Sequence, residues 1–314
     1  MDDTHQHPAP AGGIAEPEAE EEVVYCHGHP DTPTKLRCSR CDKPICGRCA
    51  VPAAVGQHCV WCVAEARKSA PKVRSALQKN SPAVMVIIGL SVAVYALEII
   101  YGLNLRPNQI NPVLERFGQI PANIVFNGEY YRLITPMFLH APLGEPFGLL
   151  HILFNMYILR IYGPQVEGRF GTLRFSLMYL LTGFVAAAAS MAFGSCGQIG
   201  IGASGAVFGV VGILLVVLYN RRHQSYVNDY LRTLLMFVAI NLMLGFSLGG
   251  IDNFAHMGGL AAGIAVGIGV DKGRQGDAST YQQVATMIAV GLVGLALVAW
   301  RVSSMPAICE VFVR

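Results

Sequence analysis

Charged residues are scarce in this sequence: they make up 14% of its 314 residues, against roughly 25% in an average soluble domain. Hydrophobic residues make up 53%. This composition excludes a disordered chain and argues against a purely soluble enzyme. The net charge of +3 is too small to indicate binding to nucleic acid. We therefore expect a membrane protein.

A secretion signal is also lacking, because the acidic start has no basic segment followed by an apolar stretch. We expect the amino terminus to stay in the cytosol. Residues 1–22 are rich in Pro, Ala, Gly and Glu, and their small apolar surface predicts a disordered tail. Residues 66–81 form a basic linker. Between them, residues 23–65 form a cysteine-rich module.

Beyond residue 81 the sequence contains seven apolar segments of nearly the ~20 residues that cross a bilayer. They cover 82–101, 147–164, 171–193, 202–219, 231–248, 252–270 and 284–303. Lys and Arg cluster before the first segment and after the second, fourth and sixth. All four clusters lie on one side if every segment spans the membrane, and that side is cytosolic. This pattern predicts an all-α polytopic protein of the cell membrane, with a cytosolic amino terminus and an external carboxyl terminus.

Cysteine is rare outside residues 26–62, which hold seven of the nine. Four ligand pairs with two-residue spacers occur there: Cys26 with His29, Cys38 with Cys41, Cys46 with Cys49, and Cys59 with Cys62. Eight such ligands suit two tetrahedral zinc ions. A segment this short buries little core, so metal would supply most of its folding free energy. A disulfide framework is the alternative, but it needs an oxidising compartment.

The spacing of these pairs resembles a B-box-like or RING-like cross-brace. The resemblance implies that Cys26, His29, Cys46 and Cys49 hold one zinc ion, and that Cys38, Cys41, Cys59 and Cys62 hold the other. His58 could replace Cys59, and His27 is a weaker substitute. A complete cysteine site leaves no open position for catalysis. We therefore expect a structural module with a binding or regulatory role, and a protein partner for it.

Four polar residues stand out within the apolar segments, where they are costly and usually functional. They are His151 and Asn155 in the second segment, Ser204 at the start of the fourth, and His256 in the sixth. In the predicted topology all four lie at a similar depth below the outer surface. Glycines four residues apart in the fourth and sixth segments favour close packing of these two helices.

These residue types together suit nucleophilic catalysis. A serine hydroxyl needs a base to become a good nucleophile, and His256 can be that base for Ser204 if the two helices touch. Asn155, His151 and the backbone N–H of Ser204 can donate hydrogen bonds to an oxyanion. Asp252 lies one turn before His256 but near the interface, so the sequence predicts a Ser–His dyad.

Each residue also has a simpler interpretation. A membrane serine usually bonds its own backbone, a histidine can line a proton or metal path, and an asparagine can join two helices. The combination favours catalysis.

The motifs resemble those of rhomboid intramembrane serine proteases. They are Tyr131-Arg132, the HILFN segment at 151–155, the GASG segment at 202–205, and the AHMGGLAAG segment at 255–263. The resemblance covers residues 82–270 and implies a six-helix catalytic bundle, with 284–303 as an added seventh helix. It implies Ser204 as nucleophile, His256 as base, and His151 and Asn155 in the oxyanion site. It further implies no catalytic cofactor and single-span membrane proteins as substrates.

Four further expectations concern packing. Phe208 lies one turn after Ser204 and suits packing against His256, and Arg132 suits bonding to loop carbonyls. Glu167 and Arg169 suit an ion pair. His140 suits a structural role or a water route. Whether Cys196 and Cys309 form a disulfide stays open at this point.

Three other functions compete with proteolysis. An inactive relative would bind membrane clients without cutting them, although it would not need Ser204 and His256. A transporter or channel would use His151, Asn155 and His256 as a polar path, but no inverted repeat is visible. A membrane-anchored zinc adaptor is compatible with protease activity.

Overall fold

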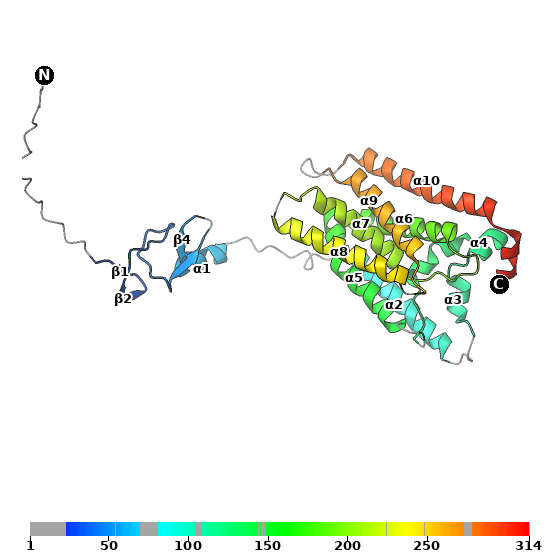
Figure 1. Cartoon of the computed structure of the whole chain (residues 1–314), viewed down its shortest axis with the longest axis horizontal. Helices are drawn as coiled ribbons and strands as arrows, with labels where there is room; N and C mark the ends of the chain where they lie inside the picture. Colours follow the sequence, from blue (N-terminus) through cyan, green and yellow to red (C-terminus); the bar gives the residue numbers. More distant parts are fainter. Residues whose placement is uncertain are drawn as a thin grey trace, which may run out of the picture. The chain divides into compact units, whose positions relative to one another are not determined.

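The computed structural model describes residues 23–53, 55–69, 81–103, 109–143, 145, 148–223, 225–247, 249–272 and 278–313, apart from the side chains of 67–69 and 225–226. The chain divides into two compact units, Met1–Val73 and Arg74–Arg314. Figure 1 shows a small β-containing module in the first and a helical bundle in the second. The predicted disordered tail and most of the predicted basic linker lie outside the described residues.

The cysteine module consists of two antiparallel hairpins and a short helix. Strand β1 (Tyr25–Cys26) pairs with β2 (His29–Pro33), and β3 (Ala50–Pro52) pairs with β4 (Gln57–Cys59). Helix α1 (Val60–Ser69) follows directly. The buried core of this unit consists of six cysteines and Ile45. A core this small leaves the cysteine sites as the main source of order.

Among the residues that the structure describes, the second unit contains seven long helices, which agrees with the predicted all-α membrane fold. They are α2 (Pro82–Gly102), α5 (Gly148–Phe170), α6 (Thr172–Phe193), α7 (Ser204–Tyr219), α8 (Ser225–Ser247), α9 (Asn253–Val270) and α10 (Thr280–Ser304). Five of these, α2, α6, α8, α9 and α10, are long and apolar enough to cross a membrane. Helix α7 is apolar but has 16 residues. The number of crossings stays a prediction.

Two helix boundaries differ most from the apolar segments of the sequence. Helix α5 continues to Phe170 rather than ending near residue 164, because its last turns carry charged residues that hydropathy alone would place outside a helix. Pro164 lies inside it. Helix α8 begins at Ser225, about two turns before the expected start, and its first turns are likewise polar.

The described part of the connection between α2 and α5 is folded rather than extended. It contains α3 (Pro112–Phe117), α4 (Pro121–Asn127) and two 3-10 turns, η2 (Tyr130–Leu133) and η3 (Thr135–Phe138). The Arg132 guanidinium donates to the carbonyls of Glu115 and Gly118 at 2.9 and 2.6 Å. As expected, this buried arginine holds the loop together by its backbone.

A disulfide joins Cys196, just after α6, to Cys309 in the final 3-10 helix η5 (Ala307–Phe312). The bond resolves the question left open by the sequence. It fastens the end of the chain beside the loop that leads into α7. Phe312 packs against Gly197 in the same loop.

Helices α7 and α9 pack backbone against backbone. A Cβ at Gly259 would lie 2.0 Å from the Gly205 carbonyl oxygen, and a Cβ at Gly263 would lie 2.0 Å from that of Gly209. Only glycine fits at these two positions of α9. The expected closeness of the fourth and sixth segments is therefore present, and glycine is its cause.

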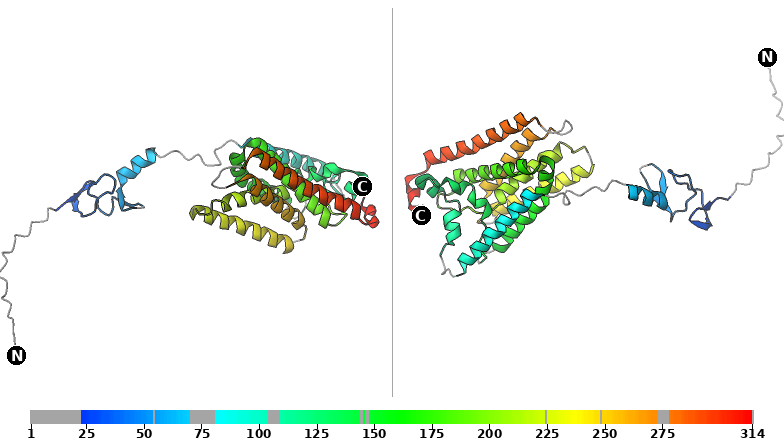
Figure 2. Two further views of the ribbon diagram at one scale, coloured as in Figure 1. Left: turned by 90° about the horizontal axis from the view of Figure 1, so that it is seen from above. Right: turned by 180° about the vertical axis from the view of Figure 1, so that it is seen from behind.

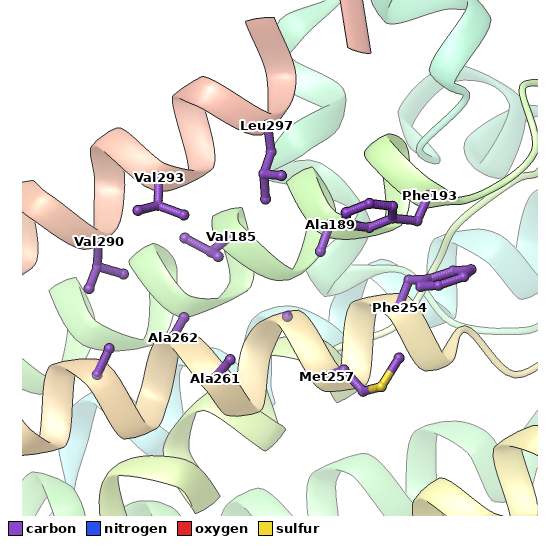
Figure 3. A pocket seen from close by; sticks show the side chains of 12 residues that line it. Val185, Ala189, Phe193, Phe254, Met257, Ala261, Ala262, Val290, Val293 and Leu297 are labelled. Carbon is purple, nitrogen blue, oxygen red and sulfur yellow. The ribbon is translucent and has the colours of Figure 1, made fainter. Parts of the chain in front are cut away.

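The final helix α10 lies against α6 and α9, as the views in Figures 1 and 2 agree. An apolar groove opens where these three helices meet (Figure 3). Val185 and Ala189 of α6, and Val293 and Leu297 of α10, line it. Phe193 and Phe254 contact each other at one end of the groove, with ring centroids 5.7 Å apart.

A buried carboxylate joins helix ends at the side of the bundle away from Ser204. Asp271 accepts hydrogen bonds from Arg169 at 2.7 Å, from Arg221 at 3.0 Å and from Asn220 at 2.9 Å. The expected ion pair between Glu167 and Arg169 is therefore replaced by other partners. Glu167 instead accepts two backbone N–H groups at the start of α2. The N-terminus of a helix stabilises a carboxylate in this position.

The Gly263 contact predicts that Gly263→Ala destabilises the bundle. A Cβ there would force α7 and α9 apart, at a cost of about 1–3 kcal/mol. Thermal unfolding in detergent should show a lower midpoint for this variant. Gly89→Ala is the matched control, since no atom lies within 4 Å of a Cβ at Gly89 of α2. Equal midpoints for wild type and Gly263→Ala would contradict the packing argument.

The Asp271 cluster predicts a pH-dependent contribution to stability. Burial alone would raise the pKa of Asp271, but the bonds from Arg221, Asn220 and Arg169 lower it from 3.8 to about 2. A depressed pKa stabilises the folded state above pH 3.8, by about 2 kcal/mol, and this is lost as pH falls through about 2. Asp271→Asn should therefore unfold at lower temperature at neutral pH. The difference from wild type should shrink as pH is lowered from 5 towards 2; a constant difference would exclude this role for the carboxylate.

Candidate active site

Ser204 and His256 meet at the contact between α7 and α9. Ser204 is the first residue of α7, and His256 lies in the first turn of α9. His256 Nε2 lies 2.9 Å from Ser204 Oγ, within hydrogen-bonding distance. The Gly205–Gly259 approach lies beside this pair, so the close helix contact is what brings the two side chains within reach.

The His256 ring is held on its face. Phe208, one turn after Ser204 on α7, stacks on it with a centroid distance of 4.4 Å and an interplanar angle of 13°. Among the described residues, His256 Nδ1 has no hydrogen-bond partner. Asp252 caps α9 by accepting the Ala255 N–H and also bonds Ser190. Stacking thus takes the place of an acid in orienting the imidazole, as a dyad requires.

Gly202 leaves space for a reacting atom beside Ser204. Its φ of +118° is rarely adopted by other residues. A Cβ placed on it would lie 2.8 Å from His151 Nε2 and 3.7 Å from Ser204 Oγ. The absence of a side chain at residue 202 therefore opens a position between the Ser204 hydroxyl and the His151 ring. Such a position suits a carbonyl oxygen that becomes an oxyanion.

The hydrogen bonds of His151 indicate which nitrogen carries its proton. The Ala141 N–H donates to His151 Nδ1 at 3.3 Å, so Nδ1 holds a lone pair. A neutral imidazole then has its hydrogen on Nε2, the atom that faces Gly202. Asn155 donates one amide hydrogen to the His151 carbonyl at 2.9 Å and keeps a second one for another acceptor.

The four polar residues predicted from the sequence line one cavity. It has a volume of about 1450 Å³, and His151, Asn155, Ser204 and His256 all contribute to its wall. The loop before Ser204 is fixed by hydrogen bonds to the folded α2–α5 connection, from Gly202 N–H to the Pro136 carbonyl and between Gln119 and Gly200. The structure therefore gathers four residues from α5, α7 and α9 around one space.

The cysteine module forms two further candidate sites. Its ligand atoms gather in two groups, Cys26, His29, Cys46 and Cys49, and Cys38, Cys41, Cys59 and Cys62. This is the division that the cross-brace resemblance implied. Both groups are able to hold a metal ion. His58, the alternative to Cys59, belongs to neither group.

Distances between the ligand atoms fit a tetrahedral ion. His29 Nδ1 lies 3.4 Å from Cys46 Sγ and 3.3 Å from Cys49 Sγ, and Cys41 Sγ lies 3.8 Å from Cys59 Sγ. Bond lengths of about 2.3 Å to sulfur and 2.0 Å to nitrogen place tetrahedral S···S edges near ~3.8 Å and S···N edges near ~3.5 Å. The donor set and its size therefore suit zinc.

Two features of the site were missed at the level of sequence. The sequence marks Gly202 only as part of the GASG segment, whereas the structure shows the space that it opens. Glu98 was overlooked, although it is an acidic residue in an otherwise apolar segment, which is the usual sign of function in a membrane helix. Its side chain is 1% exposed and accepts the backbone N–H of His140.

Comparison with known proteins agrees with this geometry. Residues 127–272 match the family model of the rhomboid domain. The chain is 37% identical over 172 residues to RHOMBOID-like protein 1 of Arabidopsis thaliana, covering 52% of this chain and 42% of that protein. It is 36% identical over 165 residues to Rhomboid protease GluP of Bacillus subtilis, covering 51% and 30%.

A third relative is Rhomboid-like protease 1 of Toxoplasma gondii, 30% identical over 183 residues, covering 57% of this chain and 60% of the relative. The chain thus spans less than two thirds of each of these relatives. The matched region includes the three helices that carry the four predicted site residues. A multi-pass helical bundle, a cavity with serine and histidine in contact, and these matches agree: residues 127–272 of the chain form a rhomboid domain.

Proposed function

We propose that the protein is an intramembrane serine endopeptidase with a Ser204–His256 dyad. The observation that carries this proposal is the 2.9 Å contact between Ser204 Oγ and His256 Nε2 inside a membrane-helix bundle. Several named relatives are proteases of the rhomboid type. A histidine in contact with a serine is the minimum that activates the hydroxyl.

The proposed reaction proceeds in two halves. Ser204 Oγ bonds to the scissile carbonyl carbon as His256 Nε2 takes the hydroxyl proton. His151 Nε2–H and Asn155 stabilise the oxyanion, beside Gly202. His256 then protonates the amine, the C–N bond breaks, and an acyl ester remains on Ser204. Water attacks the ester, gives a proton to His256, and Ser204 leaves with that proton.

The substrates of this proposal are single-span membrane proteins cut near the membrane surface. The cavity is lined by apolar as well as polar side chains, and a helical peptide bond must unwind before it is exposed to attack. The site would open to the outside of the cell membrane, and the amino terminus would lie in the cytosol. A disulfide beside the loop that leads to Ser204 supports an oxidising exterior on that side.

The cysteine module is proposed to hold two structural zinc ions. Each group supplies four thiolate or imidazole ligands, so no position stays open for a substrate. The module would then act by binding a protein partner rather than by chemistry.

Ser204→Ala should abolish cleavage of a reconstituted single-span substrate and leave the protein folded. Loss of a nucleophile costs roughly 10⁴-fold or more in kcat. Ser176→Ala is the matched control, because Ser176 of α6 bonds its own helix carbonyl. Fluorophosphonate labelling of wild type, absent in Ser204→Ala, would report an activated serine. Unlabelled, inactive wild type would favour the inactive client-binding relative or the adaptor.

Purified protein should contain two zinc ions per chain, and Cys38→Ser should lower this to one. Metal analysis measures the ratio. Chelation should make the seven module thiols reactive, while Cys196 and Cys309 stay in their disulfide. Seven thiols that react fully without a chelator would exclude resident zinc. Cleavage should persist after chelation, because the proposed zinc ions take no part in the proposed reaction of Ser204 and His256.

A further inference from the structure

A buried carboxylate lies behind the predicted oxyanion histidine. Glu98 sits in the last turns of α2 and is 1% exposed. Its two oxygens accept the backbone N–H of His140 at 3.2 and 3.4 Å. A buried charge is costly unless well paired. Among the described residues, the His140 N–H is the hydrogen-bond donor to the Glu98 carboxylate. A contribution to stability alone therefore explains poorly why an acid is buried here.

The peptide that Glu98 holds touches His151 in two ways. The next N–H along the chain, that of Ala141, donates to His151 Nδ1 at 3.3 Å. The His140 ring, fully buried, meets the His151 ring edge-on with centroids 5.2 Å apart. Tyr95, one turn before Glu98 on α2, also meets the His140 ring edge-on, with centroids 6.4 Å apart. His151 is thus supported from behind by His140 and Ala141.

These contacts connect α2 to the reacting atoms. Glu98 fixes the His140 N–H, and the adjacent Ala141 N–H fixes the acceptor state of His151 Nδ1. The hydrogen of His151 then lies on Nε2, facing the space beside Gly202. We propose that Glu98 is a positioning residue that keeps His151 oriented and in the tautomer that donates to the oxyanion. This inference rests on the proposed function, because it assigns Glu98 a role in the same reaction.

Glu167 provides a matched control. It is also a buried carboxylate, 3% exposed, and it accepts the backbone N–H groups of Ala83 and Val84 at 3.0 Å. It lies at the opposite end of α2 from Glu98. Its loss should lower stability without any specific effect on His151. Glu167 also accepts the Thr172 hydroxyl at 2.9 Å, but both carboxylates are buried acceptors of backbone N–H groups at opposite ends of α2.

The test is a double-mutant cycle between Glu98→Ala and His151→Ala in the full chain, with kcat, KM and thermal midpoint measured on a reconstituted substrate. Glu98→Ala should lower kcat by about 10- to 100-fold and leave KM nearly unchanged. The upper limit is the decrease in kcat expected when one oxyanion donor is removed. In the His151→Ala background it should change kcat by less than about twofold, since coupled residues are non-additive. Glu98→Gln keeps one acceptor oxygen and should recover part of kcat.

Glu167→Ala should lower the thermal midpoint. Any change that it causes in kcat should be the same in wild type and in the His151→Ala background. Losses for Glu98→Ala and His151→Ala that multiply, or a folded Glu98→Ala with wild-type kcat, would overturn the inference. If Glu98→Ala does not fold, the cycle is run with Glu98→Leu, which fills more of the space and also lacks an acceptor oxygen, and the same criteria apply. Wild type that cleaves nothing would instead overturn the proposed function.

Discussion

The architecture depends on the contact between two helix backbones, α7 and α9. Glycines let the Gly259 and Gly263 positions lie against the carbonyl oxygens of Gly205 and Gly209. Lipid offers little hydrophobic drive for helix association, so close packing of this kind supplies much of it. Ser204 and His256 lie at one end of this contact. Backbone proximity is thus the physical condition for the proposed dyad.

Further contacts surround Ser204 and His256 and limit the movement of the side chains around them. Phe208 stacks on His256 from α7, and the peptide after His140 supports His151 from the α2–α5 connection. Arg132 in turn fixes that connection through its carbonyls. The described part of the loop between α2 and α5 therefore forms one wall of the cavity. Preorganised donors of this sort avoid reorganisation when charge develops.

Much of this was predictable from the sequence, because membrane segments report depth. Hydropathy placed His151, Asn155, Ser204 and His256 at one level, and glycine spacing paired the two relevant helices. Depth does not report rotation about a helix axis or a distant partner. Hydropathy therefore could not predict that Arg169 bonds Asp271, about 100 residues away, or that Glu167 bonds the start of α2. Pairing of Cys196 with Cys309 needed the folded loop in the same way.

The disulfide has a consequence for the covalent integrity of the chain. Cys196 and Cys309 are 113 residues apart, and between them lie α7, α8, α9 and α10. This stretch is a closed ring that contains both Ser204 and His256. A nick in any loop of the ring leaves the two fragments tethered, so a clipped molecule would migrate as one species until a reductant is added. Ser204 and His256 stay parts of a single molecule even after such damage.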